Sequence, residues 1–146
     1  MSIQPAYRDA ERTNNSKRSA RIYKDLNLNF TRHPTTKQVS VLTDAAAVKR
    51  SVRNLVQMGE YEKPFHPEIA SGVRDMLFEN MTPFTAHALQ TKITDVITNF
   101  EPRALLTSVE VLPRFDENQY EVIVEFYIQN APAELIDLSF TLERLR

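Results

Sequence analysis

The 146-residue chain contains no cysteine and only two glycines. The absence of cysteine excludes disulfides, thiolate metal sites and cysteine nucleophiles. Because Gly59 and Gly72 are the only glycines, the glycine-rich loops that hold phosphates in nucleotide-binding proteins are excluded as well. No apolar stretch approaches the ~20 residues of a membrane-spanning helix, and no secretory signal follows Met1. We therefore expect a soluble chain with no membrane segment and no targeting signal.

Chemically reactive side chains show no arrangement typical of an active site. The three histidines lie 33 and 21 residues apart and lack metal-ligand spacing: His33, His66 and His87. No serine or threonine lies in a nucleophile-elbow motif. Asp75, Glu79 and Glu101 are candidates for the paired carboxylates of a glycoside hydrolase, although acids that flank helices are usually caps or ion-pair partners. We predict no catalytic residue, no metal, no cofactor and no small-molecule substrate.

Charge is divided unevenly along the chain. Residues 1–53 hold eleven Lys or Arg and four Asp or Glu, whereas the remainder holds seven basic and fifteen acidic residues. Residues 1–20 have no apolar periodicity, so we predict a flexible basic arm before a single domain that spans residues 21–146. The arm is a candidate for nucleic-acid binding, but we favour a solvated tail because Tyr7 is its only aromatic residue and single-strand binders need several.

The first part of the domain is predicted to form two strands and an amphipathic helix. Alternation of apolar and polar residues indicates strands over 22–30 and 39–41. Asp44 is predicted to cap a helix over 45–58, which Gly59 ends. The helix places these apolar residues on one face: Ala45, Val48, Val52, Leu55 and Val56.

Prolines shape the loop that follows this helix. Pro64 and Pro67 disfavour helix in the residues before them, so residues 63–67 are predicted to be extended. Phe65 is the expected anchor of this loop. A short helix is predicted over 68–78, although Gly72 weakens that prediction.

The longest helix has the clearest signals. Thr82 followed by Pro83 is typical of a helix start, and Pro102 prevents continuation past Phe100. Its apolar residues form one continuous stripe: Leu89, Ile93, Val96, Ile97 and Phe100.

In the last third of the chain, apolar and polar residues alternate with a period of two, which is typical of strands. Strands are predicted around Val109 and Val111, over 120–128 and over 136–142. We expect an α+β fold, in which a three-stranded antiparallel sheet is covered on one face by the two amphipathic helices and the early strands are added to it.

Glu101-Pro102-Arg103 places two opposite charges at a stiff corner after the long helix. Pro102 holds Glu101 out of helical geometry, and an arginine at such a corner can grip a carboxylate with two hydrogen bonds. Taken alone, the tripeptide is equally well explained as a helix stop with a local ion pair.

In context, the tripeptide belongs to a set of motifs. They occur in the following order: Asn54-Leu55-Val56, Lys63-Pro64-Phe65 with Pro67, Leu77-Phe78-Glu79-Asn80-Met81-Thr82-Pro83 and Glu101-Pro102-Arg103. Together with the long helix and the two valine-rich strands, they resemble the baseplate wedge family of contractile-tailed phages, the twenty-five-like sheath initiators, which also has members in type VI secretion. The resemblance covers residues 25–129.

The resemblance implies a structural role in the virion tail baseplate, with host cytoplasm as the place of assembly. Six copies are expected around the tail tube, a further candidate partner. The corner is expected to dock on a helical core bundle of other wedge proteins, and the sheet edge to template the first ring of sheath subunits by strand addition. The implied partner-binding residues are Glu101, Pro102, Arg103, Lys63, Pro64, Phe65 and Glu79. The alternatives are a lysozyme-like cell-wall glycoside hydrolase and a nucleic-acid-binding module that uses the basic arm.

Overall fold

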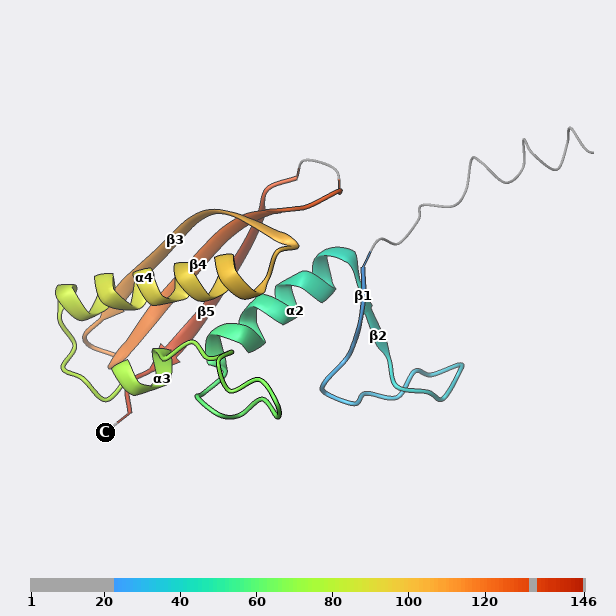
Figure 1. Ribbon diagram of the computed structural model, residues 1–146, viewed down its shortest axis with the longest axis horizontal. Helices are drawn as coiled ribbons and strands as arrows, with labels where there is room; N and C mark the ends of the chain where they lie inside the picture. Colours follow the sequence, from blue (N-terminus) through green and yellow to red (C-terminus); the bar gives the residue numbers. More distant parts are fainter. Residues whose placement is uncertain (1–22, 132–133, 146) are drawn as a thin grey trace, which may run out of the picture.

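The computed structural model describes residues 23–131 and 134–145 (Figure 1), so the predicted arm of residues 1–20 lies outside the described part. The elements follow one another in this order: β1 (Lys24–Leu26), β2 (Val41–Thr43), α2 (Asp44–Gln57), α3 (Val73–Met76), α4 (Pro83–Phe100), β3 (Ala104–Arg114), β4 (Gln119–Ile128) and β5 (Ile136–Glu143). None of these helices is both long and apolar enough to cross a membrane. The predicted α+β class is confirmed.

The three C-terminal strands form an antiparallel meander in the order β3-β4-β5. Val109 of β3 pairs with Val124 of β4, which pairs with Leu138 of β5. Because successive side chains of a strand point to opposite faces, this register brings the apolar residues of all three strands to one face. Burial alternates along β4 and β5 as the sequence predicts. The fully buried residues of β4 are Tyr120, Val122, Val124 and Phe126.

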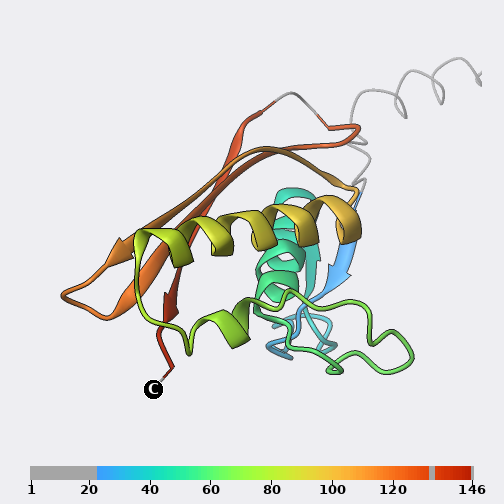
Figure 2. The ribbon, with the colours of Figure 1, turned by 60° about the vertical axis from the view of Figure 1, so that its left-hand side comes forward.

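Helices α4 and α2 lie on this apolar face of the sheet (Figures 1 and 2). The predicted start of α4 is confirmed, since the Thr82 hydroxyl accepts a hydrogen bond from the Thr85 N–H (3.1 Å) and Pro83 is the first helical residue. The large, completely buried core residues of the two helices are Val48, Val52, Val56, Leu89, Ile93 and Ile97. Each of these side chains contributes about 1.5–3 kcal/mol through burial.

The early strands do not join this sheet, so that prediction is wrong. β1 and β2 form a separate two-stranded sheet beside the start of α2 (Figure 1). The strand predicted over 22–30 is shorter, because the Phe30 N–H bonds back to Asn27 O (2.9 Å) and Phe30 has φ 52°, so the chain turns there. Leu26 and Val41, which pair with each other, are both exposed. The hairpin therefore contributes few apolar side chains to the core.

The predicted bounds of two helices are also wrong. Thr43 is the N-cap of α2, and Asp44 is the first residue of the helix. The helix ends one residue early because Met58 is extended, and Gly59 does not take the left-handed conformation of a helix-terminating glycine. Of the helix predicted over 68–78 only α3 forms, because Gly72 takes the left-handed conformation (φ 59°) immediately before it.

The loop after α2 differs from its prediction as well. Residues 63–67 are not extended, because the His66 N–H bonds to Lys63 O (3.3 Å) and closes a turn. Phe65 has φ 66° at this turn and is 97% exposed, so it is not the anchor of the loop. Ile69 packs against the core instead.

Candidate functional site

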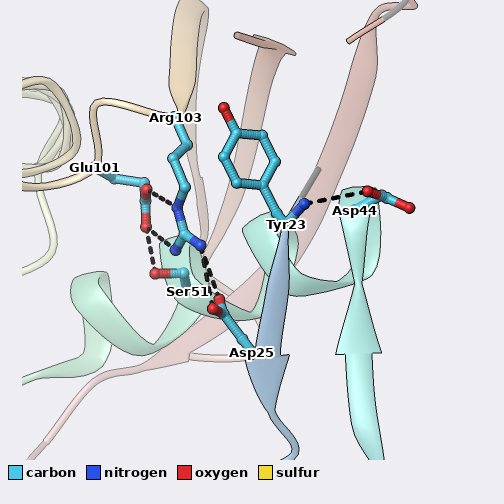
Figure 3. Close-up of polar contacts among 6 residues, drawn as sticks. All are labelled: Tyr23, Asp25, Asp44, Ser51, Glu101 and Arg103. Atoms are coloured by element: carbon cyan, nitrogen blue, oxygen red, sulfur yellow. Dashed lines mark hydrogen bonds and ion pairs between the residues drawn. The ribbon is translucent and has the colours of Figure 1, made fainter. Parts of the chain in front are cut away.

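An ion pair between neighbouring residues closes the corner after α4 (Figure 3). Glu101 is the C-cap of α4, and its N–H still bonds to Ile97 O (2.9 Å). Arg103 donates from Nε to Glu101 Oε1 (2.7 Å) and from Nη2 to Oε2 (2.9 Å). The tripeptide therefore forms the local ion pair that was the alternative explanation, with two hydrogen bonds from Arg103 to the Glu101 carboxylate.

Residues from distant segments complete this corner, as Figure 3 shows. Arg103 Nη1 donates to both carboxylate oxygens of Asp25 in β1 (3.2 and 3.0 Å). Ser51 of α2 donates its hydroxyl to Glu101 Oε2. The guanidinium also lies over the Tyr23 ring, with its central carbon 5.6 Å from the ring centroid. The corner, defined as Asp25, Ser51, Glu101 and Arg103, thus joins β1, α2, the end of α4 and the segment before β3.

Tyr23 adds further links between the hairpin and the rest of the molecule. Its hydroxyl donates to Gln129 O (2.9 Å), and the Gln129 N–H donates to Arg103 O (2.9 Å). The Asp44 N–H donates to Tyr23 O (2.9 Å), and the Tyr23 N–H donates to Asp44 Oδ1 (3.4 Å). These bonds hold β1 against both the start of α2 and the end of β4.

Glu101 and Arg103 keep their charges at neutral pH. Burial acts to raise the pKa of Glu101, which is only 4% exposed, but hydrogen bonds from Arg103 and Ser51 outweigh burial and hold that pKa below its ordinary value. The hydrogen bond to Glu101 raises the pKa of the Arg103 guanidinium, against the opposing effect of burial. Glu101 is therefore ionised and charge-paired, which suits it to a structural ion pair and not to general-acid catalysis.

Two of the candidate hydrolase carboxylates, Glu79 and Glu101, are not brought together. Glu79 precedes α4, and the Asn80 carbonyl beside it accepts a bond from the Thr85 hydroxyl in the first turn of the helix. Glu101 directly follows the last residue of α4. Eighteen residues of helix separate these acids by about 27 Å at ~1.5 Å per residue, whereas glycoside hydrolysis needs ~5–10 Å.

The remaining acid of this set offers no better arrangement. Asp75 lies in α3 and is exposed, as is Glu79. Neither has the apolar enclosure that keeps a general acid protonated. Within residues 23–131 and 134–145, no group of three or more His, Asp or Glu could hold a metal ion.

The predicted loop residues divide between two environments. Lys63 lines a groove of about 260 Å³ beside the corner residue Ser51. The other residues of this groove are Leu28, Asn54, Leu55, Met58, Ile69 and Phe100. Phe65 is exposed to solvent, as are Pro64 and Pro102. The structure thus brings Lys63 close to the corner and leaves Glu79 near the opposite end of α4.

The two edges of the main sheet differ in regularity. β3 carries a bulge between Leu106 and Ser108. Ser108 and Arg114 fall on the side of β3 that bonds to β4, so Pro113 presents its backbone to the outer edge, where it has no N–H to donate. Bulges and edge prolines are features that prevent further strand pairing.

The outer edge of β5 has neither feature. The Arg144 N–H bonds to Asn118 O toward β4 (3.1 Å), so by alternation the odd-numbered residues of β5 point their N–H and C=O groups outward. Among the described residues, the outward groups of Asp137, Ser139 and Thr141 make no main-chain hydrogen bond. β5 therefore offers a regular, proline-free edge for pairing with another strand.

Comparison with known proteins identifies the family. Residues 43–133 match the family described as "Baseplate wedge protein gp25". The chain is also 30% identical to the baseplate wedge protein gp25 of Enterobacteria phage T4 over 106 residues, which is 73% of this chain and 80% of that protein. The chain belongs to the gp25 baseplate wedge family. The family predicted from the sequence motifs is thus confirmed.

Solved structures share the fold of this wedge-family chain. A proposed tail lysozyme of Geobacter sulfurreducens superposes with a TM-score of 0.66 at 20% identity, over 74% of this chain and 98% of that one. A chain of the anti-feeding prophage baseplate superposes with a TM-score of 0.58 at 22% identity, over 85% of this chain and 87% of that one. A chain of the postcontracted pyocin R2 baseplate superposes with a TM-score of 0.58 at 18% identity, over 74% of this chain and 100% of that one.

Sequence reasoning missed half of the corner. Asp25 and Ser51 lie 78 and 50 residues from their partners Arg103 and Glu101. Neither belongs to a local motif, so no spacing rule points to them. An alternating segment near Asp25 indicates a strand, but nothing in the sequence indicates that this strand meets the end of α4.

Proposed function

We propose that this chain is a structural wedge subunit of a contractile-tail baseplate, present in six copies, and not an enzyme. It docks on a helical core bundle of other wedge proteins with the surface around the Glu101–Arg103 corner and the Lys63–Phe65 loop. It templates the first sheath ring by accepting an extended sheath segment as an added strand. The observation that carries the proposal is membership of the gp25 baseplate wedge family together with a regular open edge at β5.

The internal bonding of the corner supports a specific docking role. Arg103 already bonds to two carboxylates of its own chain. Opening these bonds for a partner would leave a buried Glu101 without its counter-charge, which is strongly unfavourable. The corner therefore acts as a brace, and the partner contacts the exposed residues beside it, including Pro102 and Phe65 and the groove that Lys63 lines.

The geometry of β5 supports strand addition. An extended peptide that adds to a sheet edge gains main-chain hydrogen bonds, while alternate side chains give specificity. β4 is the central strand, so a proline at Val124 would destroy the sheet itself. A proline at Leu138 would also damage the sheet, because the N–H of this even-numbered residue points toward β4. Thr141 is suitable, because its N–H points outward.

Complementation of tails that lack this chain tests both steps. Lys63→Glu combined with Phe65→Ser alters only exposed positions, so the protein should fold and fail to enter baseplates. Thr141→Pro should enter baseplates that carry no sheath, whereas the control Thr141→Val, which keeps the N–H, should support sheath growth. Incorporation is measured by quantifying the chain in purified particles, and sheath is scored by electron microscopy.

Three results would each overturn part of the proposal. Normal incorporation of the double variant would exclude docking through the Lys63–Phe65 loop. Full-length sheaths on particles that contain the Thr141→Pro variant would exclude templating at the edge of β5. Release of peptidoglycan fragments by the purified protein, lost on Glu79→Gln or Glu101→Gln, would exclude the purely structural role.

A further inference from the structure

A cationic pocket lies between α2 and the free edge of β5. Its volume is about 410 Å³, and it is lined by Arg50, Arg53, Asn54, Gln57, Phe140 and Thr141. The first four residues belong to α2 and the last two to β5. A strand added to β5 would thus pass along this pocket, with its helix-facing side chains directed toward α2.

The two arginines of the pocket lack acidic partners. Arg53 donates from Nη2 to Ser139 O at 3.3 Å and lies over the Phe140 ring, 5.9 Å from its centroid. Arg50 donates from Nη2 to the Asn29 side chain (2.5 Å). Neither forms an ion pair with any described residue. In contrast, Arg103 and Arg114 each pair with a carboxylate.

The Nε atoms of Arg50 and Arg53 are buried and have no hydrogen-bond partner in the described structure. A buried donor without an acceptor is unfavourable, more so when the donor is charged. Because they are three residues apart on one helix, the two guanidinium groups also repel each other. A carboxylate that bound both guanidinium groups would offset this repulsion, and it matches the planar donor geometry of arginine.

The position of Arg53 connects this pocket to strand addition. Ser139 O is one of the outward carbonyls of β5, and its bond to Arg53 occupies the acceptor that an added strand requires. An incoming N–H would replace this long bond and release the guanidinium. On the added strand, the residue opposite Phe140 would face the same side as Phe140, which is the side of α2 and its arginines.

We propose that the sheath segment added at β5 carries an Asp or Glu opposite Phe140, and that its carboxylate binds Arg50 and Arg53. This inference rests on the proposed strand addition at β5, and it adds the chemistry that selects the segment and fixes its register. Register needs such a determinant, because main-chain bonds alone are equally satisfied when a strand slips by two residues.

Peptide binding to the full chain tests the inference. Overlapping synthetic peptides that span the sheath subunit of the same particle are titrated with the protein, and affinity is measured by fluorescence anisotropy. The binding peptide should contain an acidic residue whose change to the corresponding amide weakens binding about tenfold or more. The double variant Arg50→Met/Arg53→Met should bind the acidic peptide more weakly by the same factor. Its affinity for the amide peptide should equal that of the unchanged protein. The matched control is Arg74→Met, an exposed arginine of α3.

The outcomes separate this inference from the proposed function. Suppose that Thr141→Pro abolishes peptide binding but the Arg50/Arg53 double variant binds with unchanged affinity. This result would support strand addition at β5 and overturn the carboxylate contact. Unchanged affinity with Thr141→Pro would overturn strand addition at β5 and the inference with it. Binding by a peptide of residues 1–22 of this chain, and by none from the sheath, would identify a second copy as the occupant and overturn the sheath assignment. Thermal unfolding of each variant verifies that it is folded.

Discussion

The two sheets of this molecule are stabilised by different interactions. In the three-stranded sheet, the side chains of one face are buried under α2 and α4, and Tyr120, Val122 and Phe126 have no exposed surface. In the two-stranded sheet, Leu26 and Val41 are paired with each other and remain exposed. The small sheet is attached mainly through the polar corner and through Tyr23.

This difference separates folding from positioning. Apolar burial is the dominant favourable contribution to folding, so the main sheet and its helices form the stable unit. Two strands alone are marginal in water, and the β1-β2 hairpin therefore depends on Arg103 to hold it beside α2. We infer that the Glu101-Pro102-Arg103 motif places an exposed apolar hairpin next to the groove that Lys63 lines.

The largest effect is expected from a cavity in the main sheet. Phe126→Ala removes a completely buried ring in the central strand and should lower the free energy of unfolding by about 3–5 kcal/mol. Urea denaturation of the purified protein measures this loss. Phe84→Ala is the matched control, because Phe84 is exposed at the start of α4, and its effect should stay within about 0.5 kcal/mol. Equal losses for the two variants would contradict the assignment of the core.

The same difference explains which parts of the fold could be predicted. Alternation of period two predicts β4 and β5, and the stripe of period 3.6 predicts α4, because each pattern reflects burial on one face. The hairpin has alternation without burial, so the pattern indicated a strand but gave no information about its sheet. Phe65 is predicted to anchor its loop, but it lies at a turn after Pro64 and is exposed.

The candidate site was predictable to a similar, partial degree. Pro102 indicates a helix stop, and the opposite charges that flank it indicate a local ion pair, which the structure shows between Arg103 and Glu101. Asp25 and Ser51 could not be found, because contacts across 78 and 50 residues leave no trace in a single sequence. The absence of an acidic partner for Arg53 among the described residues also cannot be predicted without the tertiary structure.

An intermediate effect is expected at the corner itself. Glu101→Gln keeps the shape of the side chain but removes the charge that Arg103 and Ser51 bind, and it should lower the free energy of unfolding by about 1–3 kcal/mol near neutral pH. Folding lowers the pKa of Glu101 below 4.5, so its contribution is fully present above that pH and is lost as the pH falls through the folded value. The difference in the free energy of unfolding between wild type and Glu101→Gln should therefore become smaller at acidic pH.

Urea denaturation at several pH values measures this dependence. Glu110→Gln serves as the control, because Glu110 is an exposed acid of β3 and its substitution should have little effect at any pH. A difference between wild type and Glu101→Gln that stays constant as the pH falls well below 4.5 would contradict the ionised ion pair.

The smallest effect on the free energy of unfolding is expected when only the contact between β1 and Arg103 is weakened. Asp25→Asn weakens the contact of β1 with Arg103, a partly exposed ion pair worth about 0–1 kcal/mol. Because that contact attaches only the hairpin, amide hydrogen exchange should accelerate up to about fivefold at Asn27 and Ser40, whose N–H groups bond within the hairpin. Exchange at Val124 in the main sheet should not change. Asp116→Asn, at an exposed turn position, is the control. Equal acceleration at Val124 would mean that the two sheets open as one unit, and the corner would then be part of the folding core.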